Sequence, residues 1–296
     1  MHPRARHILP FVLLLLLAGC DRPDPVELVD NEIGLAELEL LNETPPPAML
    51  GMGDVDSTIL FAADPVGAYG QLTIAGSVYD GLYIHTEATL ARAILFDRSA
   101  PVVNQSGDTI GYHTVDVGTL TLDGVPLRQK SKRIPLFDVP GDTVVGVQYV
   151  LKSAVDGITY AGAHAYEWQN PDTMLAAPLA ATITSPPAIR VTAPTPADVV
   201  SLQRNLRVRW EGGGATVRIV ISDPTDMRTI IKMRVRRNRG TAVIPRSVLR
   251  LLPAENAGFV FTFSSENVTT VSVDGFADEV RVRASTSHSV FLQVTP

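Results

Sequence analysis

The chain has 296 residues, of which 19% are charged and 6% are aromatic, and its formal net charge is −6. Its single cysteine excludes an intrachain disulfide and a metal site built from several thiolates. The 22 glycines and 22 prolines supply turns for many short strands, so the composition favours an all-β protein of about two domains.

The N-terminus is predicted to be an export signal. Arg4 and Arg6 precede an apolar run from Ile8 to Leu17, which is the order of regions in a secretory signal peptide. The run is too short to span the hydrocarbon core of a membrane as a helix, which takes about 20 residues. We therefore expect residues 1–19 to be removed.

The signal ends in Leu17-Ala18-Gly19-Cys20, which resembles the bacterial lipobox. The resemblance implies that Cys20 is lipidated and becomes the new N-terminus. The alternative is an ordinary signal peptide that leaves Cys20 as a free thiol, which secreted proteins rarely keep. The resemblance predicts a membrane-anchored lipoprotein of the cell envelope, facing the periplasm or the cell surface.

The charge of the chain is unevenly distributed. Residues 20–186 contain 8 Lys and Arg against 22 Asp and Glu, a net charge of −14, whereas residues 187–296 contain 15 against 9, a net charge of +6. Such an asymmetry suggests that the two parts have different partners, or that they attract each other.

Residues 20–50 are predicted to be an acidic tether. Asp21 to Thr44 carries eight carboxylates and one arginine and is followed by three prolines. Its apolar residues Val29, Ile33, Ala36 and Leu40 follow a helical spacing, which Gly34 interrupts.

Residues 51–184 are predicted to form a β-sandwich domain. Leu72, Ile74 and Val78 alternate with polar residues, as in half-buried strands. Asp123-Gly124 joins two apolar runs and accepts positive φ at both turn positions, so it predicts a hairpin.

Residues 185–296 are predicted to form a second β-sandwich after the proline-rich junction that begins at Ser185. Strands are expected where apolar residues alternate with arginine, around Leu206–Trp210, Ile231–Val235 and Val280–Val282. Gly212 to Gly214 is interpreted as a hairpin turn, and Pro245–Pro253 as a short helical turn.

Val208-Arg209-Trp210 and the strand lengths loosely resemble immunoglobulin or fibronectin type III modules, which implies an architecture but no activity.

Arginine and lysine on these strands form a candidate site for an anionic partner, because guanidinium groups pair with carboxylates and phosphates. The partner would be a glycan, a lipid or a protein, including the acidic half of this chain; nucleic acid is not expected. The alternative is a solvated strand face that discourages aggregation. The candidate residues are Arg207, Arg209, Lys232, Arg234, Arg236, Arg237, Arg281 and Arg283.

His164, Tyr166 and Trp168 alternate along one predicted strand and form a candidate platform for stacking sugar rings. The alternative places these side chains in the sandwich core, because each domain has a single tryptophan and small sandwiches commonly bury theirs. The two interpretations differ in whether the rings are exposed.

The sequence contains no motif that identifies an enzyme. The histidines beyond the signal are not spaced as a metal pair, and the G-x-S-x-G sequence of serine hydrolases is absent. We therefore predict a non-enzymatic envelope protein with a structural or binding role and without a cofactor or metal. The alternatives are a carbohydrate-binding or polysaccharide-system accessory lipoprotein, and a hydrolase with dispersed carboxylates, one of them with a raised pKa.

Overall fold

The computed structural model describes residues 27–28, 36–39, 69–103, 107, 109–135, 142–171, 178–273 and 279–296. Cys20 and the predicted signal lie outside these residues. Within them most residues lie in strands and the only helices are two single turns, which confirms the predicted all-β class. No helix in the described part of the chain is long and apolar enough to cross a membrane.

The elements follow one another along the chain as strands with two single-turn helices. In order they are β1 (Glu27–Leu28), β2 (Ala36–Glu39), β3 (Gly70–Asp80), β4 (His85–Val103), β5 (Thr109–Thr114), β6 (Thr121–Leu122), β7 (Val125–Pro126), β8 (Arg128–Pro135), β9 (Asp142–Lys152), α1 (Ser153–Asp156), β10 (Ala165–Gln169), β11 (Ala180–Thr184), β12 (Arg190–Ala193), β13 (Val199–Ser201), β14 (Leu206–Glu211), β15 (Thr216–Ser222), β16 (Thr229–Arg236), β17 (Thr241–Ile244), α2 (Arg246–Leu249), β18 (Gly258–Val271) and β19 (Val280–Thr295).

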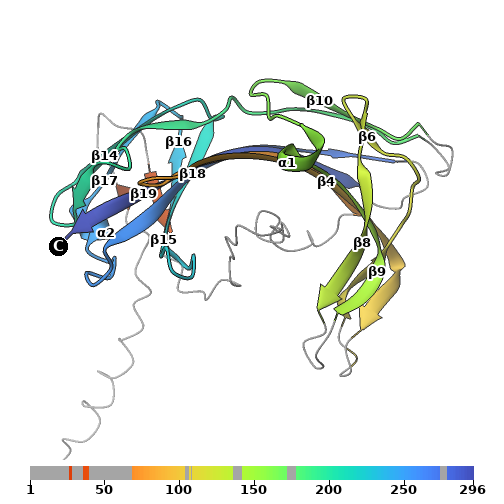
Figure 1. Cartoon of the computed structure of the whole chain (residues 1–296), viewed down its shortest axis with the longest axis horizontal. Helices are drawn as coiled ribbons and strands as arrows, with labels where there is room; N and C mark the ends of the chain where they lie inside the picture. Colours follow the sequence, from red (N-terminus) through yellow and green to blue (C-terminus); the bar gives the residue numbers. More distant parts are fainter. Residues whose placement is uncertain are drawn as a thin grey trace, which may run out of the picture.

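One long sheet runs through the described molecule, with the strand order β1-β2-β16-β15-β18-β19-β3-β4-β9-β8. Figure 1 shows this large sheet as an arch, with two small sheets on its upper side. The sheet β11-β10-β6-β7 covers the part formed by β19, β3, β4 and β9, and the sheet β12-β14-β17 covers the part formed by β15, β16 and β18. We call these two sandwiches the first and second module.

Each module has its own hydrophobic core between the large sheet and a small sheet. Trp168 and Tyr149 are buried in the first core, and Trp210 and Phe263 are buried in the second. Trp210 stacks at a tilt on Phe263, with ring centroids 5.5 Å apart, and its indole N–H donates to Asn238. The second module pairs a three-stranded sheet with β16-β15-β18-β19, the two-sheet arrangement of an immunoglobulin-like sandwich.

The hairpin of β18 and β19 belongs to both modules. β19 pairs with β18 from residue 280 to 293, while its other edge pairs in parallel with β3 from residue 280 to 290 and with β13 from residue 293 to 295. Val280 and Val282 therefore lie in the first core, whereas Val290 and Leu292 lie in the second. Val280, Val282 and Ala284, which the sequence division places with the second module, thus pack in the first core.

Several local predictions can be compared with the structure directly. Asp123 and Gly124 have φ angles of 49° and 77° and join β6 to β7, so the predicted hairpin is confirmed. Helix α2 lies inside the predicted helical turn.

Two other local predictions are wrong. Gly212 to Gly214 is not a hairpin turn, because it joins β14 to β15, which lie in different sheets. The helical spacing in the tether does not form a helix at Ala36, which begins strand β2.

Candidate functional site: the basic underside and two polar clusters

The concave face of the large sheet carries a group of basic residues that we call the basic underside. On β16 the side chains of Met233 and Val235 are buried in the core, so the intervening residues lie on the opposite face. Arg218 on β15 is the register partner of Arg234. The basic underside comprises Arg218, Lys232, Arg234, Arg236, Arg281 and Arg283.

Glu266 on β18 separates two parts of the basic underside. One carboxylate oxygen lies 3.5 Å from Nη2 of Arg218, and the other lies 2.6 Å from Nη2 of Arg283. Burial lowers the pKa of Arg283, and the charge of Glu266 counteracts this effect. Glu266 therefore offsets positive charge in the middle of the sheet, whereas the basic row on β16 lies between β15 and β2.

The predicted arginine site is divided by the structure. Arg207 and Arg209 lie on β14, which belongs to the small sheet on the other side of the second core, so they do not join the basic underside. Arg237 follows β16 with a φ of 56° and starts the turn to β17. The expectation that Arg207 and Arg209 adjoin the β16 residues is wrong, because β14 joins a different sheet and alternation within a strand does not reveal which sheet the strand joins.

Arg218 was missed as a member of the site. Its strand shows a clear signal, because Val217, Ile219 and Ile221 alternate with Arg218 and Val220. The missing information was the pairing of β15 with β16, which brings Arg218 beside Arg234.

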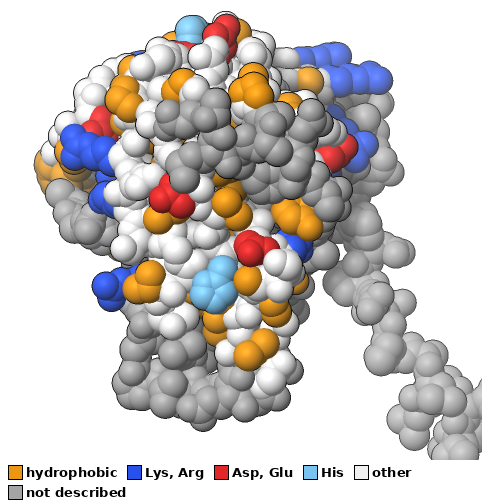
Figure 2. Space-filling model, turned by 90° about the vertical axis from the view of Figure 1, so that its right-hand side faces the viewer, with side chains coloured by type: hydrophobic (Ala, Val, Ile, Leu, Met, Phe, Trp, Pro, Cys, Tyr) orange, Lys and Arg blue, Asp and Glu red, His pale blue; other side chains and the backbone are white. Residues whose placement is uncertain are grey.

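Of the two interpretations of the aromatic row, the sugar-stacking platform is wrong and core placement is confirmed for Tyr166 and Trp168. Tyr166 is 3% exposed and Trp168 is fully buried in the first core, so neither ring offers a face to a ligand. His164 remains exposed, but its ring meets Tyr166 edge-on with centroids 4.6 Å apart. Figure 2 shows scattered hydrophobic side chains among polar ones on this end of the molecule.

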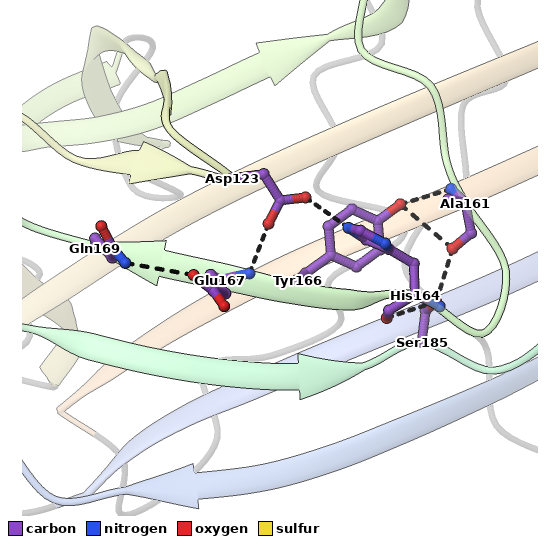
Figure 3. Close-up of polar contacts among 7 residues, drawn as sticks. All are labelled: Asp123, Ala161, His164, Tyr166, Glu167, Gln169 and Ser185. Atoms are coloured by element: carbon purple, nitrogen blue, oxygen red, sulfur yellow. Dashed lines mark hydrogen bonds and ion pairs between the residues drawn. The ribbon is translucent and has the colours of Figure 1, made fainter.

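His164 belongs instead to a polar cluster that holds the β6–β7 turn against β10 (Figure 3). Its Nε2 lies 2.9 Å from Asp123 Oδ2, and the other oxygen of Asp123 accepts the backbone N–H of Glu167 at 2.8 Å. The Tyr166 hydroxyl accepts the N–H of Ala161 at 2.6 Å. The cluster thus ties three separate segments together.

The same cluster contains the residue types of a serine hydrolase triad, but not the geometry. The hydroxyl of Ser185 donates to the backbone carbonyl of Ala161 at 2.7 Å and accepts the backbone N–H of His164 at 3.1 Å. A triad requires the hydroxyl to bond to the imidazole ring. Ser185 therefore acts on the main chain, as Figure 3 shows.

A second polar cluster joins the two modules. The backbone N–H of Val191 on β12 donates to Nδ1 of the buried His288 at 2.8 Å, so Nε2 of this ring carries the proton that it donates to Asp80 at 2.8 Å. His85 lies 2.5 Å from the other oxygen of Asp80 and 3.4 Å from Glu87. This cluster could not be predicted from the sequence, because Asp80 and His288 are 208 residues apart.

The pKa values of this cluster follow from its geometry. Burial lowers the pKa of His288 despite its bond to Asp80, and the bond to Asp80 raises the pKa of His85. Burial acts to raise the pKa of Asp80, but the bonds from both histidines outweigh it, so that this pKa is lowered. The pKa values of three other described carboxyl groups, Asp97, Asp198 and Asp223, are also lowered, by hydrogen bonds from neighbouring groups.

The sequence matches no protein-family model and no curated protein. Among solved structures, the fibronectin(III)-like modules of Clostridium thermocellum CbhA are 12% identical, with a TM-score of 0.21, and the match covers 75% of this chain and 94% of that one. The yeast delta-COP-I mu-homology domain is 10% identical, with a TM-score of 0.26, and the match covers 78% of this chain and all of that one. Scores this low assign neither the topology nor a function.

Proposed function

We propose that this protein is exported, anchored at Cys20 by lipid, and used as a non-catalytic binding or structural component of the bacterial envelope. The observation that carries the localisation is the run Leu17-Ala18-Gly19-Cys20 after a basic and then apolar segment. The role of its two β-sandwich modules is supported by polar clusters whose histidine and serine groups bind turns, backbone and neighbouring strands.

The binding surface that we propose is the β16 part of the basic underside. Lys232, Arg234 and Arg236 repeat along one strand, and Arg218 adjoins Arg234 on the next. Four cationic groups on adjacent strands form a positive patch beside β2 that favours an anionic partner, because guanidinium groups donate to carboxylate and phosphate oxygens in pairs. Such a contact depends on salt, because exposed charges are screened over about 10 Å at 0.1 M ionic strength.

The anchor is tested by Cys20→Ser in the native host. We expect the variant to appear in the soluble fraction and to lose incorporation of a labelled fatty acid, while the wild type stays with the membranes. Retention of the variant in the membrane fraction, with unchanged labelling, would contradict the anchor.

The binding surface is tested by capture from the native envelope with the exported chain carrying Cys20→Ser. Lys232→Ser with Arg234→Ser should abolish capture that is strong at low salt and weak at high salt. Arg207→Ser with Arg209→Ser is the matched control, because it removes the same charge from the opposite sheet. Equal loss in both double variants would show that only net charge matters.

A further inference from the structure

The acidic segment before the modules contributes a strand to the large sheet. β2 (Ala36–Glu39) pairs antiparallel with β16, and β1 (Glu27–Leu28) pairs with β2. β16 pairs with β15 on its other side, so β2 occupies what would otherwise be the edge of the sheet in the described part of the chain. An uncovered edge offers unpaired N–H and C=O groups to any extended segment.

The register between β2 and β16 matches residue types on both faces. Glu37 is the partner of Arg234, and Glu39 is the partner of Lys232. At the alternate positions Leu38 is the partner of Met233, and Ala36 is the partner of Val235. Met233 and Val235 are buried in the second core. A shift by one residue would oppose the glutamates to the buried residues instead, so the sequence of the segment specifies this register.

The pattern Ala-Glu-Leu-Glu therefore complements this edge at every position. Opposite charges directly across an antiparallel pair stabilise the pairing, and like charges oppose it. The main-chain hydrogen bonds of strand addition supply affinity, whereas alternate side chains supply specificity. Both parts of strand recognition are present between residues 36–39 and β16.

We propose that the edge of β16 is a binding site for an extended acidic segment, and that residues 36–39 of the same chain are its occupant. The segment docks as an exchangeable strand rather than as a spacer that only lifts the modules. If the proposed anchor at Cys20 holds, the docked state keeps β16 within sixteen residues of the lipid, a reach of at most about 55 Å. The docking itself does not depend on the anchor.

Amide hydrogen exchange of the full exported chain with Cys20→Ser tests the docking. Glu37→Lys with Glu39→Lys should speed exchange at residues 36–39 and at the edge amides of β16 by at least about tenfold, because like charges then face each other. Exchange in β18 and β19 should stay unchanged, which shows that the modules remain folded.

Two further variants distinguish docking from a general effect of charge. Glu32→Lys with Glu43→Lys changes the net charge equally outside β1 and β2, and should leave the protection of β16 unchanged. Adding Lys232→Glu and Arg234→Glu to the Glu37→Lys, Glu39→Lys variant should restore protection, because the charge pairs are re-formed in reverse. Failure of this rescue, or an equal effect of the control, would overturn the proposal.

A peptide of residues 33–42 identifies the occupant. It should bind to the Glu37→Lys, Glu39→Lys protein, whose edge is vacated, and more weakly to the wild type, whose edge is filled.

Light scattering should show a monomer at all concentrations. Protection of β16 that rises with protein concentration together with a dimer would assign the strand to a second copy, and would overturn docking within one chain. Membrane release by Cys20→Ser is measured separately, so failure of the anchor and failure of docking are distinguishable.

Discussion

Asp80 holds two histidines where the modules meet, and its removal should destabilise the protein. Asp80→Ala deletes the acceptor of the buried His288 Nε2–H and of His85. Loss of hydrogen bonds to a charged group costs about 1.5–3 kcal/mol, which urea unfolding would measure. Glu87→Ala is the matched control: its bonds to His85 and Arg190 are 3.4 Å long and exposed, so we expect about 0.5 kcal/mol or less. Equal effects would show that Asp80 acts only through surface charge.

His288 should make the stability depend on pH. Burial lowers its pKa in the folded state below the unfolded value, which is about 6.5. The unfolded chain therefore takes up the proton first, so the free energy of unfolding should fall as the pH drops below about 6.5. His85 acts in the opposite direction, because its pKa is raised in the folded state.

Urea unfolding at several pH values on both sides of the unfolded histidine pKa separates these two contributions. His288→Gln should flatten the loss of stability at low pH, whereas His85→Gln should steepen it. His113 and His164 are present in both variants and serve as a constant background. An unchanged slope in His288→Gln would show that other groups control the pH dependence.

At the scale of elements, the corner between β14 and β15 is held by the shortest backbone approach among the described glycines. Gly212 has a φ of 73°, and a Cβ atom there would lie 2.0 Å from the carbonyl oxygen of Ala188. Gly212→Ala should therefore cost at least about 3 kcal/mol, from the left-handed backbone and from displacement of a fixed neighbour. Gly124→Ala is the matched control, because Gly124 has a similar φ of 77° but a Cβ atom there would meet no neighbouring atom within 4 Å. This substitution should cost about 1 kcal/mol. Thermal or urea unfolding would compare the two.

Strand existence could be predicted from the sequence because alternation is local. The alternation of Ile231, Met233 and Val235 predicts a half-buried strand, whichever strands it pairs with. Strand pairing could not be predicted, because β19 joins β3 in parallel across about two hundred residues. The same reason explains why Arg207 was grouped with Arg234, although their strands lie in different sheets.

The aromatic row shows a different limit of sequence reasoning. Alternation correctly placed Tyr166 and Trp168 on one side of β10, although His164 lies just before the strand, but it does not state whether that side faces the core. Burial of Tyr166 and Trp168 decides for the core. In the acidic tether the period itself was misinterpreted. The apolar residues fit a helical spacing, but Ala36 to Glu39 form a strand whose two-residue alternation matches β16.

On the scale of the whole molecule, the two modules should unfold together. The β18–β19 hairpin passes through both cores, and β19 pairs with β3 and with β13 along one edge. Opening either module therefore breaks hydrogen bonds and apolar contacts that the other shares. Each core contains one tryptophan, so the modules can be observed separately.

Single-tryptophan variants provide the measurement. Trp210→Phe leaves Trp168 to report on the first core, and Trp168→Phe leaves Trp210 to report on the second. In each variant the midpoint of urea unfolding from fluorescence should coincide with the midpoint from far-ultraviolet circular dichroism. Separate midpoints would show that residues 51–184 and 185–296 unfold as independent domains, as a division at the proline-rich junction implies.

A core deletion in one module tests the coupling more directly. Val282 is fully buried in the first core, so Val282→Ala should destabilise that core by about 2 kcal/mol. In the protein that keeps only Trp210, this change should lower the urea midpoint reported by Trp210 in the second core, because β19 contributes residues to both cores. Val268→Ala on β18, where the side chain is 42% exposed, should leave that midpoint unchanged. A Val282→Ala protein whose second-core signal does not move would show that the continuous strand links the modules in space without coupling their stability.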